Sequence, residues 1–117
     1  MITGLHHISM ISSSEASVDF YKRLGFEEFF RKKRNYDTVV LLRGYGLQLE
    51  IFVDPSHPQR ATNPENIGLR NFALKVDDIE NTVKELKISS AKIETDWIGE
   101  RYCFIADPDG LQIQLHE

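Results

Sequence analysis

Cysteine is nearly absent from this sequence: Cys103 is the single one among 117 residues, so an internal disulfide is excluded. Without a disulfide the chain has to fold by burying apolar side chains, and its 41% hydrophobic residues are enough for a core. A lone thiol suits a reducing compartment, and Cys103 falls in a strand-like segment where it reads as a small core side chain. We therefore expect a cytoplasmic protein.

Long apolar runs and a basic charge excess are also missing. No uninterrupted apolar segment approaches the roughly 20 residues of a membrane-spanning helix. The first four residues run into a strand-like segment without the basic flank and apolar stretch of a signal peptide. The 14 basic and 18 acidic residues give a formal net charge of −4, whereas nucleic-acid binding needs a basic field. We expect contact with neither a membrane nor nucleic acid, and read the basic run at residues 31–34 as a solvated strand end.

The first half of the chain predicts one strand, one helix and then three strands. Residues 5–11 are apolar and partly β-branched, as in a strand. Ser12 and Glu15 stand at capping-box spacing, and Ala16, Phe20 and Leu24 define one helical face that Gly25 ends. Three strand-like runs follow at residues 26–32, 37–43 and 46–53. The turn at residues 44–46 joins the last two strands into a hairpin.

The second half predicts the same order after a proline-rich segment. Residues 54–66 contain three prolines and no apolar period, so they read as a linker. A strand is expected at residues 69–76, followed by a helix with Asp77 and Glu80 at capping-box spacing. Strands are expected at residues 91–97, 102–106 and 111–116, and the last two flank a proline- and glycine-containing turn at residues 107–110.

The two halves align at one constant interval. Leu5 matches Leu69, and residues 46–48 (Gly-Leu-Gln) match residues 110–112 (Gly-Leu-Gln), each 64 positions apart. Two short β-rich segments could look alike by chance, but the shared order of elements favours a true repeat. The sequence therefore predicts an α+β fold in which two βαβββ modules form a curved mixed sheet with a concave cleft. It would be a single domain spanning residues 1–117, with module one at 1–53, a linker at 54–66 and module two at 67–117.

Strand alternation predicts which side chains share a face. In the first and fourth strands of each module, aliphatic residues alternate with polar or mixed residues, as on the two faces of a half-buried sheet. The aliphatic faces should lie under the helices. The other faces are either solvated or line a ligand cleft. The side chains expected to line that cleft are Ser9, Gln48, Phe52, Asn71, Gln112 and Gln114.

The chain resembles the vicinal oxygen chelate superfamily, which includes glyoxalase I, bleomycin-resistance proteins and extradiol dioxygenases. It is most similar to the small single-domain proteins described as lactoylglutathione lyase-like. Four segments carry the resemblance: residues 5–8 (Leu-His-His-Ile), 20–26 (Phe-Tyr-Lys-Arg-Leu-Gly-Phe), 68–79, and 107–111 (Asp-Pro-Asp-Gly-Leu). The resemblance implies paired βαβββ modules, a small-molecule ligand, a homodimer, and a divalent metal in the cleft.

The resemblance also implies where metal ligands would lie. The ligand positions on the first and fourth strands correspond to His7 and Glu50 in module one, and to Asn71 and Gln114 in module two. The family usually has a histidine and a glutamate at both pairs of positions, so here half of the donors are neutral amides. Such a set weakens a site for Ni²⁺, Co²⁺, Zn²⁺ or Mn²⁺. Glu50 remains as the candidate catalytic base and, with His7, as the candidate metal ligand.

Three functions follow as hypotheses. The first is a glyoxalase-like lyase or isomerase of the carbon–sulfur lyase class with a reduced divalent-metal site. The second is a metal-free protein that binds or sequesters a small molecule, like the bleomycin-resistance proteins. The third is an interaction module whose cleft holds no ligand.

Overall fold

A computed structural model describes all 117 residues. The chain divides into two compact units, Met1–Gln59 and Arg60–Glu117, which are called module one and module two from here on. The boundary falls inside the segment predicted as a linker. The model confirms the α+β class and the repeated order of one strand, one helix and three strands. Each module forms its own four-stranded mixed sheet and is described by itself below.

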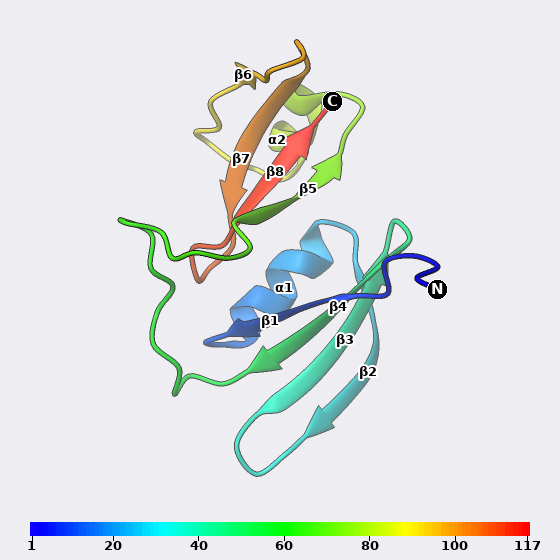
Figure 1. Ribbon diagram of the computed structural model, residues 1–117, viewed down its shortest axis with the longest axis vertical. Helices are drawn as coiled ribbons and strands as arrows, with labels where there is room; N and C mark the ends of the chain where they lie inside the picture. The colour runs from blue at the N-terminus through cyan, green and yellow to red at the C-terminus, as the bar shows by residue number, and fades with distance from the viewer. The chain divides into compact units, whose positions relative to one another are not determined.

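Module one contains β1 (Ile8–Ser12), α1 (Glu15–Arg23), β2 (Glu27–Lys33), β3 (Thr38–Gly44) and β4 (Leu47–Val53). The strand order in the sheet is β1-β4-β3-β2, with β1 parallel to β4 and the other neighbours antiparallel. Figure 1 shows α1 lying across one face of this sheet. The core therefore forms from inward-facing strand residues and the buried face of the helix. Its members are Met10, Val18, Tyr21, Phe26, Val40, Leu42, Leu49 and Ile51.

Helix α1 begins and packs differently from the sequence prediction. Ser14 is the N-cap, and its hydroxyl accepts a hydrogen bond from the backbone N–H of Ala16 at 3.2 Å. Ser12, the predicted cap, is instead a buried residue at the end of β1 whose hydroxyl donates to the carbonyl of Ser14. The buried face of the helix is made by Ser17, Val18 and Tyr21, so the predicted stripe that began at the exposed Ala16 was wrong. Two staggered stripes compete on so short a helix, and packing on the sheet selects between them.

Helix α1 ends at Arg23 with Leu24 as its C-cap, and Gly25 then turns the chain with φ of 108°. The Tyr45 hydroxyl, from the tight turn between β3 and β4, donates a hydrogen bond to the carbonyl of Leu24. The Tyr45 ring also meets the Phe26 ring edge-on, with centroids 5.4 Å apart. The β3–β4 hairpin therefore fastens the end of the helix.

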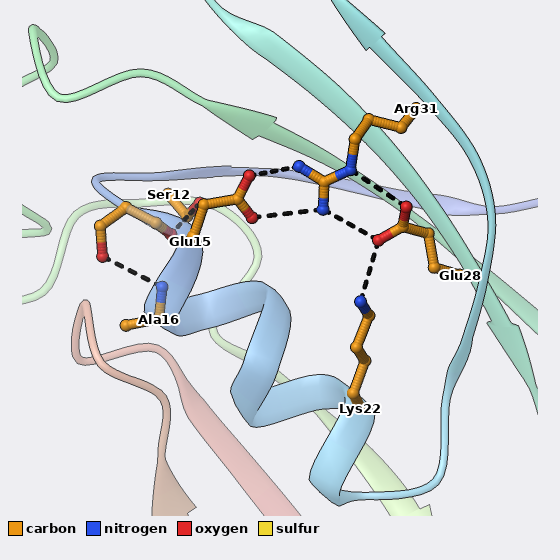
Figure 2. Close-up of polar contacts among 7 residues, drawn as sticks. Ser12, Glu15, Ala16, Lys22, Glu28 and Arg31 are labelled. Atoms are coloured by element: carbon orange, nitrogen blue, oxygen red, sulfur yellow. Dashed lines mark hydrogen bonds and ion pairs between the residues drawn. The ribbon is translucent and has the colours of Figure 1, made fainter.

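A charge network ties α1 to the edge strand β2, as Figure 2 shows. The Arg31 guanidinium lies between two carboxylates and donates to Glu15 and to Glu28, while the Lys22 ammonium lies 3.0 Å from Glu28. Hydrogen bonds from Arg31 and then Lys22 lower the pKa of Glu28 to about 2. The hydrogen bonds that Arg31 donates to Glu28 and Glu15 raise the pKa of Arg31.

Module two contains β5 (Asn71–Lys75), α2 (Ile79–Glu85), β6 (Glu94–Thr95), β7 (Arg101–Ala106) and β8 (Gln112–His116). The strand order is β5-β8-β7-β6, again with one parallel pair, β5 with β8. In Figure 1, α2 lies behind β7 and β8. The buried residues of this module are Ile79, Cys103, Ile105, Ile113 and Leu115, together with Asp107. Cys103 is therefore a core side chain, as the sequence predicted.

Three further details of the sequence prediction needed correction. β1 begins at Ile8, where parallel pairing with Leu49 starts, so the preceding residues 5–7 lie outside the strand. β6 has only two residues instead of seven, because its pairing with β7 covers Glu94 and Thr95 alone. The N-cap of α2 is Asp78, whose side chain accepts from the backbone N–H of Asn81, and not Asp77. Neither helix is long and apolar enough to cross a membrane.

Candidate functional site

In module one, the sheet face away from the buried core carries Glu50 and its neighbours. Ser9 lies beside Glu50 in the β1–β4 register, and its hydroxyl donates to a Glu50 carboxylate oxygen at 3.1 Å. Gln48 and Phe52 lie two residues either side of Glu50 on β4 and so share its face, and all three are half-buried. The Arg34 guanidinium lies over the Phe52 ring, 5.6 Å from its centroid. The model thus brings four of the predicted residues onto one face.

His7 lies in the exposed segment just before β1. Its Nδ1 is 2.8 Å from Nδ1 of the equally exposed His6, so one of the two imidazoles donates to the other. Continuing the β1–β4 register back one residue places His7 opposite Gln48. The predicted ligand is therefore next to the sheet face that carries Glu50, but it lies outside the strand itself.

Module two contains a pocket of about 810 Å³, formed entirely by its own residues. This volume lies within the range of roughly 300–1,000 Å³ that is usual for small-molecule sites. Three predicted residues, Asn71, Gln112 and Gln114, line it. The others that line it are Arg60, Ala61, Thr62, Glu65, Arg70, Thr95, Asp96, Trp97, Tyr102, Phe104 and Gly110.

The carboxamides form one wall of this pocket because the sheet register aligns them. Asn71 on β5 lies beside Gln112 on β8, and Gln114 follows two residues further along the same face of β8. Gln114 also faces Phe104 across the β7–β8 pair. Each carboxamide offers two donors and one acceptor oxygen without net charge. This wall, called the amide row below, can hydrogen-bond to both donors and acceptors of a neutral molecule.

The part of the pocket that β7 and the β6–β7 turn form is aromatic, and a histidine–aspartate pair holds it. Tyr102 and Phe104 meet edge-on, with ring centroids 5.7 Å apart, and the fully exposed Trp97 follows Asp96 in the β6–β7 turn. His116 Nε2 lies 2.9 Å from a carboxylate oxygen of Asp96, and the His116 ring stacks on Tyr102 at an interplanar angle of 13°. This pair joins the β6–β7 turn to the end of β8.

The pKa values of this pair shift in opposite directions. The hydrogen bond with Asp96, and then that with the Glu117 carbonyl, raises the pKa of His116. Backbone donation from Glu100, and then the hydrogen bond with His116, lowers the pKa of Asp96. Both ring nitrogens of His116 thus face acceptors, which favours the imidazolium.

Three of the four charged side chains that line the pocket are paired with an opposite charge, and the fourth, Arg60, donates to backbone carbonyls. Arg70 makes a two-nitrogen contact with Glu65 at 3.0–3.1 Å, and Arg60 donates to the backbone carbonyls of Leu69 and Arg70. Asp96 is paired with His116. The lining residues Arg60, Arg70, Glu65 and Asp96 carry two positive and two negative charges, so the pocket has no net preference for an ion of either sign.

The donor residues do not fit the metal site that the family resemblance implies. Two of the four positions hold neutral carboxamides, Asn71 and Gln114, and both line the module-two pocket. Imidazole and carboxylate suit transition ions, whereas an amide oxygen is a weak uncharged donor. A separate carboxylate group, Asp78, Glu80 and Glu117, lies at the start of α2. It already has protein partners: Asp78 caps the helix, and Arg101 pairs with Glu80 and Glu117.

Sequence reasoning missed the aromatic side of the pocket. From the sequence, Trp97 and Tyr102 are expected mostly in the core or at the rim, with one or two such aromatics over the cleft. Strand alternation places His116 on the same face as Gln112 and Gln114, but it predicts neither the role of His116 nor that of Asp96. A signal was available in part, because Tyr102 and Phe104 alternate with the buried Cys103 and Ile105 on β7 and so must share the face of the amide row.

Comparison with known proteins identifies the family. The family model for the Glyoxalase/Bleomycin resistance protein/Dioxygenase superfamily matches residues 4–115, and the chain belongs to this superfamily. It is 36% identical to the Uncharacterized protein YwkD of Bacillus subtilis (strain 168) over 126 aligned positions, covering 100% of this chain and 98% of that one. It is also 36% identical to the Uncharacterized protein YaeR of Escherichia coli (strain K12), covering 97% and 95% of the two chains.

Solved structures of similar proteins have the same fold. A glyoxalase family protein from Enterococcus faecalis superposes with a TM-score of 0.87 at 34% identity, covering 97% of both chains. More distant structures share the fold alone. They include a lactoylglutathione lyase from Agrobacterium tumefaciens, with a TM-score of 0.70 at 21% identity, and a bleomycin-binding protein complexed with bleomycin, with 0.64 at 20%.

Proposed function

We propose that this protein binds a small, neutral polar molecule in the module-two pocket and needs no transition metal to do so. The observation that carries the proposal is the amide row: Asn71, Gln112 and Gln114 line a pocket of about 810 Å³. Carboxamides are weak ligands for a transition ion but good partners for a neutral group that both donates and accepts hydrogen bonds.

The charge pairing at the rim supports a neutral ligand. Arg70 is engaged by Glu65, and Asp96 by His116, so a bound ion would have to compete with an existing partner. A neutral molecule with an amide-like group avoids that competition. The bleomycin-binding protein, which shares the fold, is a precedent for a superfamily protein whose complex holds an organic ligand.

The test uses cyclohexanecarboxamide, a neutral probe with the required donor and acceptor, titrated into the protein in excess chelator and followed by ligand-observed NMR. A fragment of this size should bind saturably, with a Kd on the order of 1 mM. Gln114→Leu should weaken binding by about 3- to 10-fold, because it removes one hydrogen-bonding partner. Gln48→Leu, the same exchange on the sheet of module one, is the control and should change nothing. Absence of saturable binding, or equal effects of the two variants, would refute the proposal.

The second candidate is a glyoxalase-type lyase or isomerase. It is favoured by Glu50, a half-buried carboxylate held by the Ser9 hydroxyl next to the segment that carries His7. In this case Glu50 would act as the base toward a small carbonyl compound, with His7 and Glu50 holding a divalent ion as a reduced site.

The two candidates differ in their response to metal. Calorimetric titration with Ni²⁺, Co²⁺, Zn²⁺ and Mn²⁺ should show uptake at micromolar concentration for the lyase, and this uptake should be lost in Glu50→Gln and in His7→Ala. His6→Ala is the matched control, because His6 is the adjacent and equally exposed imidazole. No uptake of any of the four ions would exclude the lyase candidate.

The proposal also covers domain organisation, oligomeric state and location in the cell. We propose that the two modules act as a single domain of residues 1–117, that the protein is a homodimer, as the family resemblance implies, and that it resides in the cytoplasm. The buried free thiol of Cys103 is consistent with a reducing compartment. Light scattering would measure the dimer, and a fluorescent fusion would locate the protein.

A further inference from the structure

Trp97 stands out among the residues of the module-two pocket because it is the sole tryptophan of the chain and its side chain is fully exposed. A large aromatic surface in water is available to stack on a ligand, and covering it removes apolar area from water. Trp97 also lines the same pocket as the amide row. Its position therefore offers a flat apolar surface to whatever the amide row holds.

The turn that carries Trp97 is fixed by several hydrogen bonds. One carboxylate oxygen of Asp96 accepts from the backbone N–H groups of Ile98, at 3.0 Å, and of Glu100, at 2.9 Å. The Asp96 N–H donates to the Glu100 carbonyl, and the Gly99 N–H donates to the Asp96 carbonyl. Asp96 is thus the centre of the turn, and Trp97 follows it directly in the chain.

Side-chain contacts with His116 also attach the turn to β8. The second carboxylate oxygen of Asp96 lies 2.9 Å from His116 Nε2, and Glu100 lies 3.6 Å from His116 Nδ1. His116 is held in turn by the Glu117 carbonyl and by stacking on Tyr102, whose hydroxyl donates to Glu94. The backbone of such a turn loses little further freedom when a ligand binds, which favours affinity.

We infer that Trp97 is the specificity-determining residue of this pocket, that it stacks on a planar unsaturated ring of the ligand, and that the Asp96–His116 pair positions it. The inference rests on the proposed function, since it assumes that the amide row binds the polar group of the same molecule. The ligand class is then a neutral aromatic or heteroaromatic compound that carries an amide-like group.

The experiment compares benzamide with cyclohexanecarboxamide, which carry the same neutral carboxamide on a planar and on a saturated ring. Benzamide should quench the emission of Trp97 saturably and bind about 2- to 10-fold more tightly than the saturated probe, the gain expected from aromatic stacking. In Trp97→Leu, followed by ligand-observed NMR, that preference should disappear while the saturated probe still binds. Equal affinities in the unaltered protein, or a preference that survives in Trp97→Leu, would overturn the inference and leave the proposed function intact. Failure of both probes to bind would overturn the two together.

The positioning role of His116 has its own readout, the fluorescence anisotropy of Trp97. His116→Ala should lower the anisotropy and reduce the benzamide preference, because the turn loses its attachment to β8. His116→Gln, whose carboxamide can still donate to Asp96, should restore much of both. His57→Ala is the matched control, since His57 lies 3.3 Å from Asp54 in module one and has no part in this pocket. An unchanged anisotropy in His116→Ala would refute the positioning role. Emission that changes with protein concentration instead of with benzamide would show that Trp97 contacts a second copy, and would overturn the stacking inference.

Discussion

Adding a single methyl group at Gly25 should lower the free energy of unfolding more than such a small change usually does. With φ of 108°, Gly25 adopts a backbone conformation that residues with a Cβ rarely adopt. A Cβ built there would also overlap the Tyr45 hydroxyl and approach the Tyr45 ring carbon Cζ at 3.1 Å. Gly25→Ala should therefore both strain the end of α1 and displace the Tyr45 side chain.

The magnitude follows from three contributions. Forcing alanine into the left-handed region costs about 1–2 kcal/mol. Displacing Tyr45 removes its hydrogen bond to Leu24, about 1 kcal/mol, and part of its edge-on contact with Phe26, about 0.5–1.5 kcal/mol. The expected loss in the free energy of unfolding is about 3 kcal/mol, a large share of the stability of a domain of this size.

The assay is urea unfolding followed by far-ultraviolet circular dichroism. Gly46→Ala is the matched control, because Gly46 also has a positive φ, of 74°, but a Cβ there would meet nothing within 4 Å. It should lose only the strain contribution of about 1–2 kcal/mol. In a Tyr45→Phe background the overlapping hydroxyl is gone, so Gly25→Ala should cost less than it does in the unaltered protein, with only the 3.1 Å approach to the ring carbon Cζ left beyond the strain contribution. Equal losses for the two glycine variants in the unaltered background would refute the reasoning.

Three further predictions concern charged and turn residues. Arg31→Met should lower the free energy of unfolding by about 1 kcal/mol because it breaks the exposed network between α1 and β2, whereas its exposed neighbour Lys32→Met should change it by less than about 0.5 kcal/mol. Glu28 has a folded pKa lowered to about 2 from 4.5, so its stabilising effect is present above pH 4.5 and is lost as the pH falls toward 2. Glu28→Gln should therefore destabilise the protein at pH 7 and much less at pH 2.5, in urea titrations at both pH values; an equal loss at both would contradict the assignment. Asp107→Ala should cost about 1–2 kcal/mol, because one Asp107 oxygen accepts two backbone N–H groups of the 107–111 turn at 2.9 Å, while Asp107→Asn, which keeps an acceptor, should cost less; similar losses in the two variants would argue against these hydrogen bonds.

The candidate site could be predicted only in part. Alternation along β8 placed Gln112 and Gln114 on one face, and both line the module-two pocket. The same reasoning extended β1 too far back and put His7 inside it, because residues 5–11 alternate like a strand whether or not a partner strand reaches residues 5–7. Strand ends depend on where the neighbour pairs, and Ile8 is the first residue that pairs with β4.

The sequence by itself determined the architecture, since an interval of 64 residues, alternating strands and a helix that ends at a glycine are local or repetitive signals that need no long-range contact to be seen. It also determined that the ligand positions implied by the family resemblance differ between the two modules, because residue identity is enough to show amides at Asn71 and Gln114. Only the tertiary structure decided which helix face is buried and which residues complete the pocket. Asp96 and His116 are 20 residues apart and meet because β7 and β8 pair in one particular register, and that register brings Trp97 to the pocket.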